Sequence, residues 1–413
     1  MQPVIIVPAF SRPHSLKRLL NSIENCSFPT HGLKLIISID GKGHEDVKKI
    51  ASEFQFTHGE KKVIEHNKNL GLREHILWCG DQTDKYGSVI ILEDDLVVDP
   101  FFYIYAKESL TFYTDERKVA GIALYSPEQF DYVQLPFLPL YNGTSGYFMQ
   151  VACSWGQAWS AEQWKSFRKW YERVDERSVT ELIELPENIR KWPESSWKKY
   201  FMAYLVDQDR FFFYPFQSYS TNCSDAGGHH INQTIDTVQV NLGLPTRDME
   251  TLKFSKLENE VLYYDVYMEP FGDYIDRHLD KEYKDCTMDL FGSKPKNLLE
   301  QTKYCITSRS SIKPIKKIPL RFRPPIKNLE FMDDELTDGN LVLSRSKDVI
   351  FDQEDEVYFM LANYYSRIAF KSNMFMVPYI QHVYKQKKRE NMMNWWRRKA
   401  RYPFRLLSKL FRK

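Results

Sequence analysis

The sequence predicts an α/β protein built around a mainly parallel central sheet, and two observations indicate this class. Short buried apolar runs alternate with amphipathic stretches through the first hundred residues. Acidic residues follow two of these runs directly: Asp40 after the second, and the triplet Glu93, Asp94 and Asp95 after a later one. Strands joined by crossover helices form parallel sheets, and functional sites lie at the carboxyl ends of such strands.

The first hundred residues are expected to give four strands separated by helices. The run "PVIIVPAF" is the first buried strand, and an amphipathic helix follows because its leucines and Ile23 share one face. The run "GSVIILEDD" is the central strand, and it ends in the acidic triplet. The strands are expected within 3–10, 33–41, 61–72 and 87–95, and the helices within 12–26, 45–54 and 72–83.

The pattern continues less regularly to residue 230. Pro193 is expected to open a late helix, because proline is favoured in a first helical turn. A helix is expected at 101–116 and a strand at 119–127. The stretch 145–171 is expected to give a strand, a Trp/Gly turn and then a helix. A further helix is expected at 193–210, followed by a strand that runs from 211 into a Gly-rich loop.

Three parts of the chain follow from these patterns. Residues 1–245 form the main α/β domain. Residues 246–330 form an irregular, aromatic-rich subdomain with a Pro-rich linker, and residues 331–413 form a largely helical region that ends in a basic amphipathic tail. A chain of 413 residues is long enough to bury a full core and a smaller second unit.

The positive charge is concentrated in the tail. Residues 381–413 hold twelve Lys and Arg against one Glu, a net charge of +11, so residues 1–380 carry −9 of the overall +2. This balance argues against nucleic-acid binding by the main body. Cationic residues interleaved with Trp, Phe and Leu suit an anionic membrane surface, so we expect 385–413 to bind one; a helix docked on a protein partner is the alternative.

The cysteines and the N-terminus indicate a cytoplasmic protein. Six cysteines are scattered without CxxC or zinc-like spacing, which is typical of free thiols in a reducing compartment. The chain opens directly on a strand, with no signal peptide, and contains no run of 18 apolar residues. We therefore expect peripheral attachment to the inner face of the cell membrane.

The acidic triplet predicts a cation site. Carboxylates at the end of a central parallel strand suit a hard divalent cation, and such a cation neutralises a departing diphosphate. The alternative is a turn followed by a helix N-cap. Asp40, at the end of an earlier strand, suits hydrogen bonds from a base or a ribose. Arg12 and the loop 67–73 suit phosphates, through cations and backbone N–H groups.

Other nucleotide-binding classes lack support. The sequence has no GxGxxG after the first strand and no GxxxxGK[ST] motif. A nucleotidyltransferase remains an alternative, but the loop "PAFSRPHS" has no glycine.

The order of these motifs resembles a known family. The chain resembles a GT-A fold glycosyltransferase of the N-acetylglucosaminyltransferase I group and related bacterial sugar transferases. The resemblance lies in the order Pro8-x-Phe10-x-Arg12, then Asp40, then "NKNLG", and then the acidic triplet. The likeness continues in "SWGQAWSAEQW", "WPESSWKKYF" and "YPFQSYSTNCSDAGGHH", and covers about residues 3 to 230.

The resemblance implies a nucleotide-diphosphate sugar donor, usually UDP-linked, with Mn²⁺ or Mg²⁺. It implies that Asp95 ligates the metal, that Asp40 meets the uracil, and that His229 lies near the metal or the diphosphate. The donor-binding residues are then Pro8, Phe10, Arg12, Asp40, Asn69, Gly71, Arg73, Glu93 and Asp94.

The catalytic base departs from the family pattern. That pattern places an Asp directly after a Trp at the start of the late helix, but Lys198 follows Trp197 here. An inverting transfer needs a carboxylate to deprotonate the acceptor hydroxyl. There are two candidates for this carboxylate: Glu194, expected one helical turn before Lys198, and Asp207, further along the helix. The alternative for Glu194 is that it only stabilises the helix dipole as a first-turn residue.

We expect the acceptor to be a glycan, with a lipid-linked bacterial surface polysaccharide as the candidate. Trp155 is the candidate for stacking on its sugar, although such tryptophans also serve as core. A non-catalytic GT-A-like scaffold, recruited to a membrane by its basic tail, remains the second alternative.

Overall fold

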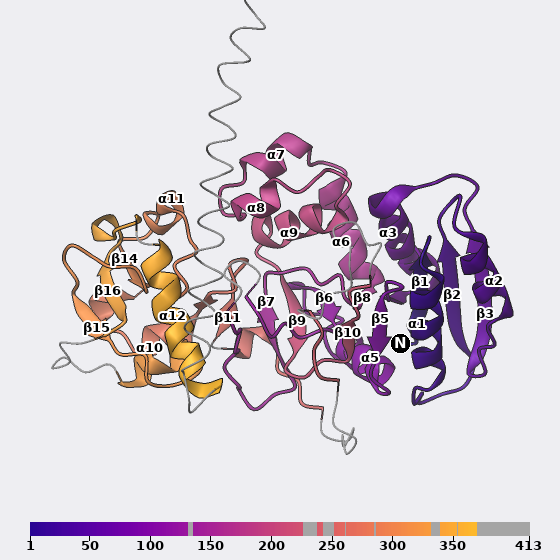
Figure 1. The fold of residues 1–413 in the computed structure, drawn as a ribbon, viewed down its shortest axis with the longest axis horizontal. Helices are drawn as coiled ribbons and strands as arrows, with labels where there is room; N and C mark the ends of the chain where they lie inside the picture. Colours follow the sequence, from indigo (N-terminus) through magenta and orange to yellow (C-terminus); the bar gives the residue numbers. More distant parts are fainter. Residues whose placement is uncertain are drawn as a thin grey trace, which may run out of the picture. The chain divides into compact units, whose positions relative to one another are not determined.

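The computed structural model describes residues 1–130, 135–225, 238–242, 252–260, 262–284, 286–331, 339–352 and 354–369. These divide into two compact units, Met1–Gln353 and Glu354–Lys413. The first unit contains a ten-stranded sheet with the order β12-β11-β7-β9-β6-β8-β4-β1-β2-β3 (Figure 1).

Four parallel strands form the N-terminal part of this sheet, as the sequence predicts. They are β4 (Ser88–Ile91), β1 (Val4–Ala9), β2 (Leu33–Ile39) and β3 (Gly59–Glu65). Helices α1 (Pro13–Glu24), α2 (Glu45–Glu53) and α3 (Gly71–Asp81) connect them, followed by the short α4 (Thr83–Tyr86). Strands β1 and β4 are buried along their whole length, because helices cover both faces of a parallel sheet.

The rest of the sheet is mixed. Strand β8 (Gln157–Ser160) runs antiparallel to both β4 and β6 (Val119–Ala123), and β7 (Gly146–Met149) runs antiparallel to β9 (Phe211–Pro215). The sequence predicts only a turn where β8 lies, because four fully buried residues show no alternation. Helices α5 (Phe102–Phe112), α6 (Ala161–Tyr171), α7 (Glu176–Glu181) and α8 (Glu187–Arg190) belong to this half, as do β5 (Leu96–Val98), β10 (Ser220–Asn222), β11 (Tyr263–Tyr264) and β12 (Pro270–Phe271).

Helix α9 (Trp197–Asp207) begins four residues later than predicted. Ser196 is its N-cap, and the Ser196 side chain accepts a hydrogen bond from the Lys199 N–H. Serine is a preferred N-cap residue, because its side-chain oxygen satisfies a backbone N–H of the first helical turn. Glu194 therefore lies in the turn before α9, and not on its first turn.

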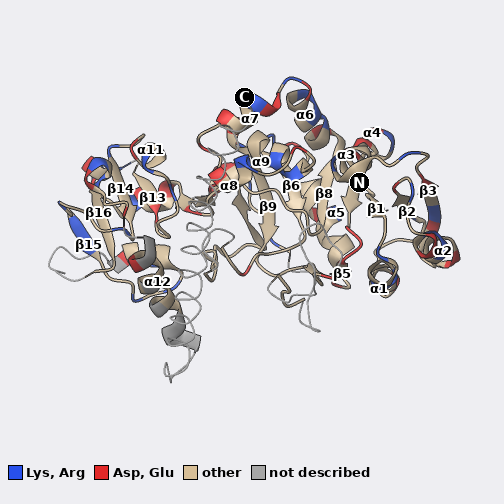
Figure 2. Ribbon diagram, turned by 45° about the horizontal axis from the view of Figure 1, so that its top comes forward, with Lys and Arg blue, Asp and Glu red and all other residues tan. Residues whose placement is uncertain are grey.

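A second sheet follows the first in the chain and has the order β13-β14-β16-β15. Its strands are β13 (Thr287–Asp289), β14 (Tyr304–Thr307), β15 (Lys316–Ile318) and β16 (Leu341–Arg345), with the short helices α10 (Asp273–Arg277) and α11 (Lys296–Leu299) nearby in the chain. The expected Pro-rich linker thus contributes a strand, and residues on both sides of position 330 share this sheet. Figure 2 shows basic residues on β15 and an acidic residue on β13.

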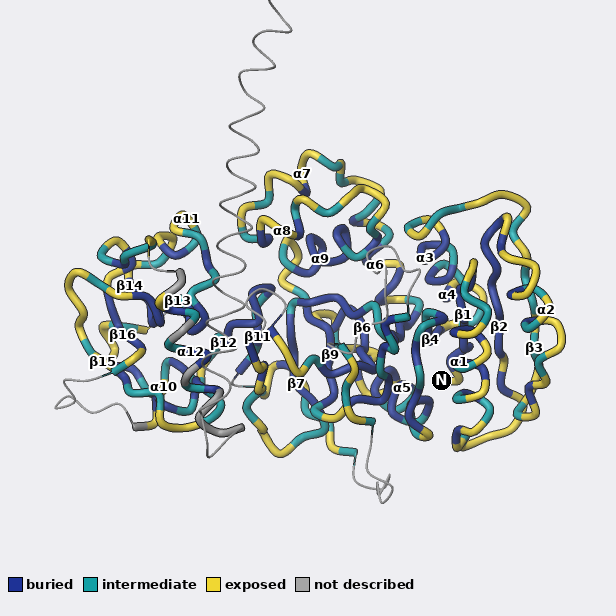
Figure 3. The backbone as a smooth tube through the Cα atoms, viewed as in Figure 1, coloured by how far each residue is buried: buried dark blue, intermediate teal, exposed yellow. Residues whose placement is uncertain are grey.

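The two sheets contact each other through buried charge. Lys294 pairs with Asp265 at 2.5 Å, and the Phe291 N–H donates to the Glu269 carboxylate at 2.8 Å. Within the second sheet, the wholly buried Asp289 accepts a hydrogen bond from Arg309 at 3.3 Å. Figure 3 shows that the strands on both sides of this junction are largely buried.

The second unit begins with helix α12 (Glu354–Ala369). The predicted basic tail, 385–413, lies outside the described residues, as does His229. Among the helices of the described part, none has the length and apolar character needed to cross a membrane. All six cysteines are free thiols, as predicted.

Candidate active site

A cavity of about 640 Å³ lies at the carboxyl ends of β1, β2 and β4. This volume falls within the usual range of ligand pockets. Many of the predicted site residues line it, although they come from distant parts of the sequence. The lining consists of Pro8, Ala9, Phe10, Ser11, Arg12, Asp40, Asn69, Gly71, Leu72, His75, Ile76, Glu93, Asp94, Asp95, Trp155, Ser195, Asn222, Ser224 and Val238.

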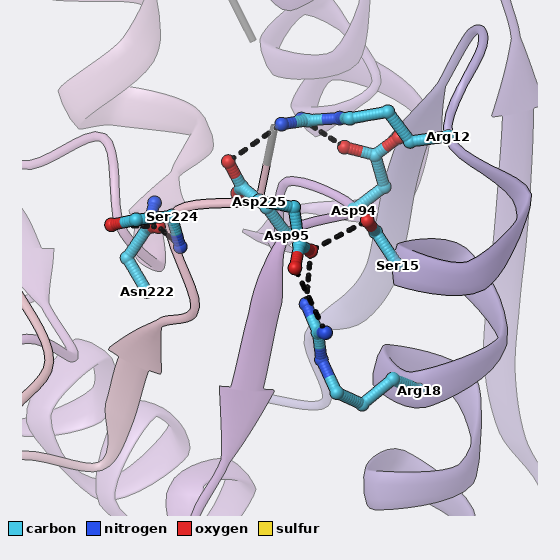
Figure 4. Close-up of polar contacts among 8 residues, drawn as sticks. All are labelled: Arg12, Ser15, Arg18, Asp94, Asp95, Asn222, Ser224 and Asp225. Carbon is cyan, nitrogen blue, oxygen red and sulfur yellow. Dashed lines mark hydrogen bonds and ion pairs between the residues drawn. The ribbon is translucent and has the colours of Figure 1, made fainter. Parts of the chain in front are cut away.

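Arg12 supplies positive charge to two members of the acidic triplet, Asp94 and Asp95 (Figure 4). Its guanidinium forms ion pairs with Asp94 and with Asp95, the latter at 2.8 Å between Nη1 and Oδ2. Burial opposes the charge of Arg12, but the two carboxylates outweigh it and raise the pKa of the guanidinium. Arg12 reaches both because it directly precedes Pro13, the first residue of α1, at the end of β1.

Glu93 differs from its two neighbours. Among the described residues its side chain forms no ion pair and no hydrogen bond, although it opens onto the cavity. Burial, together with the charge of Asp95, raises the pKa of Glu93 to about 8. Burial also raises the pKa of Asp94, to about 6, against the opposing effect of Arg12. Burial therefore favours the neutral form of the Glu93 carboxyl in the ligand-free protein.

The cavity fits a divalent cation in one specific way. The Oδ1 atom of Asp95 is buried and has no hydrogen-bond partner, which leaves a carboxylate oxygen available as a ligand. Among the described residues no group of three or more His, Cys, Asp or Glu side chains is arranged to hold a metal. Mg²⁺ and similar ions are commonly held by one or two carboxylates together with substrate phosphates and water. Asp95 fits that type of site.

Asp40 organises the loop that forms one wall of the cavity. Its carboxylate accepts three backbone hydrogen bonds, from Gly41 at 2.8 Å, Leu70 at 2.7 Å and Gly71 at 3.0 Å. Asn69 adds a bond to the Gly41 carbonyl at 3.2 Å. Sequence reasoning placed Asp40 against a base. In the structure, its oxygens are engaged chiefly in fixing the loop that carries Asn69 and Gly71.

The segment after β10 forms the opposite wall and was missed by sequence reasoning. Asp225 accepts from Ser15 at 2.6 Å and from Arg18, so it fixes this segment to α1 (Figure 4). Ser224 has φ +50°, and its N–H donates to the Asn222 side chain at 2.6 Å. Non-glycine residues rarely adopt positive φ outside constrained sites. The polar run "STNCSD" contains no distinctive motif, although it lies within the family resemblance.

His75 is another residue that sequence reasoning missed. It lines the cavity, and its Nε2 atom lies 2.8 Å from the Ser38 hydroxyl. Burial lowers the pKa of His75 to about 4, so the ring is neutral at physiological pH. Its position on α3 gave no sequence signal, because it falls among the apolar residues of that helix.

Three of the predicted site residues lie away from the cavity lining. Arg73 donates to the Glu194 carbonyl at 2.7 Å and packs over the Tyr200 ring. Glu194 is exposed, and the neighbouring Ser195 lines the cavity instead. Asp207, at the end of α9, accepts from the Trp170 indole at 2.8 Å. The prediction of Glu194 and Asp207 as catalytic carboxylates has no geometric support, because neither side chain lies at the cavity.

Similarity to solved structures covers about half of the chain. S. aureus TarS 1–349 in complex with UDP-GlcNAc matches with a TM-score of 0.35 at 14% identity, covering 55% of this chain and 60% of that one. Mouse xyloside xylosyltransferase 1 matches with a TM-score of 0.35 at 12% identity, covering 51% and 84%.

A third match is the mannosyltransferase PcManGT from Pyrobaculum calidifontis in complex with GDP-Man and Mn²⁺. Its TM-score is 0.31 at 11% identity, covering 45% of this chain and 53% of that one. No protein-family model and no curated protein sequence matches the chain.

Proposed function

We propose that this chain is a glycosyltransferase that moves a sugar from a nucleotide-diphosphate donor, UDP-linked in the first instance, to a glycan acceptor. The observation that carries the proposal is the convergence of Arg12, the loop held by Asp40, and the acidic triplet on one cavity of about 640 Å³. A nucleotide sugar needs these elements together: an apolar pocket for its base, and both cation and carboxylate groups at its diphosphate.

The donor is proposed to lie along the wall formed by β1 and the loop 69–71. Phe10 and Leu72 line the cavity and are 42% and 37% exposed, so they offer apolar surface to a base. Asp95 would hold Mn²⁺ or Mg²⁺ through its unpaired Oδ1 atom. When bound, such a cation neutralises negative charge on the leaving diphosphate. Arg12 is placed to bind phosphate oxygens, because a guanidinium has five N–H donors.

Glu93 is the proposed proton acceptor. Asp94 and Asp95 are paired with Arg12, and Asp40 is bound to backbone N–H groups. Of the carboxylates that line the cavity, Glu93 is the one that the described residues leave without a partner. A base must be ionised and must lie within hydrogen-bond reach of the hydroxyl that it deprotonates. Glu93 lines the cavity, and a divalent cation held by Asp95 would lower the pKa of the Glu93 carboxyl and so favour the ionised form.

A donor panel tests the proposal. UDP-, GDP- and dTDP-sugars would be added with Mn²⁺, and thermal shift and sugar release to water would be measured. We expect one UDP-sugar to stabilise the protein and to be hydrolysed slowly, and EDTA to abolish both effects.

The matched variants are Asp95→Ala and Asp115→Ala, the latter at an exposed position away from the cavity. Asp95→Ala should lower metal-dependent donor hydrolysis at least tenfold, whereas Asp115→Ala should not change it. A protein that no donor stabilises, and that Asp95→Ala leaves unchanged, would be a non-catalytic scaffold. Transfer of a nucleotidyl group, detected as release of pyrophosphate from a nucleoside triphosphate, would instead support the nucleotidyltransferase alternative.

The cellular role is proposed from the sequence. An acceptor carried on a membrane lipid, as in bacterial surface polysaccharide synthesis, would explain a basic amphipathic tail on residues 385–413. The enzyme would then bind the inner face of the cell membrane peripherally, from the cytoplasm.

A further inference from the structure

Lys198 lies on the first turn of α9 and lines a small cavity that adjoins the large one at Trp155. Its Nζ atom lies 5.8 Å from the ring centroid of Trp155 and 5.9 Å from that of Trp192. Both distances fall within the range of cation–π interactions. Nζ is also close enough to Glu93 to lower the pKa of that carboxyl, although burial has the larger and opposite effect. The two indoles therefore hold a cation near the proposed base.

The charge of Lys198 has no counter-charge in contact with it. Among the described residues Lys198 forms no ion pair, and its side chain forms no hydrogen bond. Its neighbour Lys199 is different: it pairs with Glu176 and donates to the Trp192 carbonyl at 2.9 Å. The first turn of α9 contains no acidic residue. A cation near a helix N-terminus is electrostatically unfavourable, because the helix dipole places positive charge there.

A second, smaller cavity explains what Lys198 faces. It has a volume of about 20 Å³, enough for one water molecule, and shares Trp155 with the large cavity. Lys198 lines it together with Tyr125, Cys153 and Tyr214, and the lining contains no carboxylate. A phosphate or carboxylate is too large for this space, so an anion would lie in the large cavity beside Trp155, the residue that the two cavities share, with Lys198 reaching it from the smaller one.

We propose that Lys198 and Trp155 form a subsite for an acceptor that carries an anionic group, either a phosphate or a carboxylate, on or next to the sugar that is glycosylated. Trp155 stacks on the sugar ring, and Lys198 binds the anion. The inference rests on the proposed function, since it assigns the chemical class of that enzyme's acceptor. A charged contact at a partly desolvated site contributes more to binding than a neutral hydrogen bond.

The donor diphosphate is a second possible source of the anion, and the geometry favours the acceptor. Arg12 and Asp95 lie at the large cavity, whereas Lys198 lines only the smaller one. Lys198 should therefore affect binding of an anionic sugar without affecting binding of UDP.

Equilibrium binding separates these sources. Glucose, glucose 6-phosphate and glucuronate would be titrated, in the presence of saturating UDP and Mn²⁺, into the full chain and into three variants. Lys198→Gln removes the charge, Lys198→Arg retains it, and Lys165→Gln removes an exposed charge from α6. UDP alone would be titrated into each protein as well.

We expect the wild-type chain to bind at least one anionic sugar five to ten times more tightly than glucose. Lys198→Gln should abolish this preference, Lys198→Arg should retain most of it, and Lys165→Gln should not change it. UDP affinity should stay within twofold throughout. Equal binding of glucose and both anionic sugars by wild type would overturn the inference, and a tenfold loss of UDP affinity in Lys198→Gln would assign Lys198 to the donor instead. Failure of the wild-type chain to bind UDP would contradict the proposed function itself.

Discussion

Glu93 is a carboxyl whose burial is unfavourable to folding once it loses its proton. Its pKa is about 8 in the folded chain, against an ordinary value of 4.5. Between these two values the unfolded chain releases a proton that the folded chain keeps, so the stability of the fold decreases as the pH rises through this interval. Replacing Glu93 by a side chain that is neutral at all pH values would remove this loss of stability.

We therefore expect Glu93→Gln to stabilise the metal-free protein at alkaline pH. Urea unfolding in EDTA should show little difference from wild type near pH 5 and a gain of a few kcal/mol near pH 9. Sugar transfer should be lost at every pH, because Gln cannot accept the proton. Glu53→Gln, at an exposed site, is the control and should change neither stability nor activity. A gain in the free energy of unfolding that did not depend on pH would show that Glu93 is ionised in the folded protein.

At the level of elements, the contact between the end of β2 and the loop 67–71 determines the shape of the donor wall. A Cβ atom built on Gly41 would lie 2.1 Å from the Lys68 carbonyl carbon and 2.4 Å from the Asn69 nitrogen. Both are backbone atoms, which cannot rotate away. The close approach allows the Asp40 carboxylate to accept hydrogen bonds from Leu70 and Gly71.

Gly41→Ala should accordingly displace this loop. We expect a loss of roughly 1–3 kcal/mol in the free energy of unfolding, the usual effect of overpacking, together with at least tenfold weaker UDP binding. Lys68→Ala changes an exposed side chain of the same loop and should leave the melting temperature unaltered. If the Gly41→Ala variant melted at the wild-type temperature and bound UDP with wild-type affinity, the loop would have room to move.

The elements also show what the sequence could predict and what it could not. Strands β1, β2 and β4 were predictable because they are short, mainly apolar runs whose residues are almost all buried. Strand β8 was not, because its four residues pair in space with β4 and β6 and have no local pattern. The start of α9 was assigned to Pro193, because proline and serine both mark helix starts and only the folded backbone shows that Ser196 is the cap.

The candidate site was predictable to a similar degree. The acidic triplet, Asp40 and Arg12 were found because each follows a strand of the parallel sheet. Asn222 and Ser224 were missed because tertiary contacts, including the bonds of Asp225 to α1, bring them to the cavity. The pairing of Arg12 with the acidic triplet was not predicted either, since 82 residues separate Arg12 from Asp94.

For the whole molecule, the uneven charge distribution leads to a prediction about membranes. The full chain should float with vesicles that contain anionic lipid, and a chain that ends at residue 384 should stay with the soluble fraction. Binding should weaken as salt is added, because screening shortens the range of the attraction. Vesicles of neutral phosphatidylcholine are the control for non-specific adsorption. Flotation of the shortened chain would show that another surface binds the lipid.

The buried charges between the two sheets also constrain how this protein can change over evolutionary time. Glu269 is completely buried, and the Phe291 N–H is its hydrogen-bond donor, while Asp265 pairs with Lys294. A relative in which an apolar surface replaced the segment 287–345 would keep Glu269 buried without its donor and Asp265 without its ion pair, and burying unpaired polar or charged groups is destabilising. Replacement of the second sheet by an apolar surface should therefore be accompanied by changes at Asp265 and Glu269. Descendants of this chain should inherit both sheets together, or show apolar residues at these two positions.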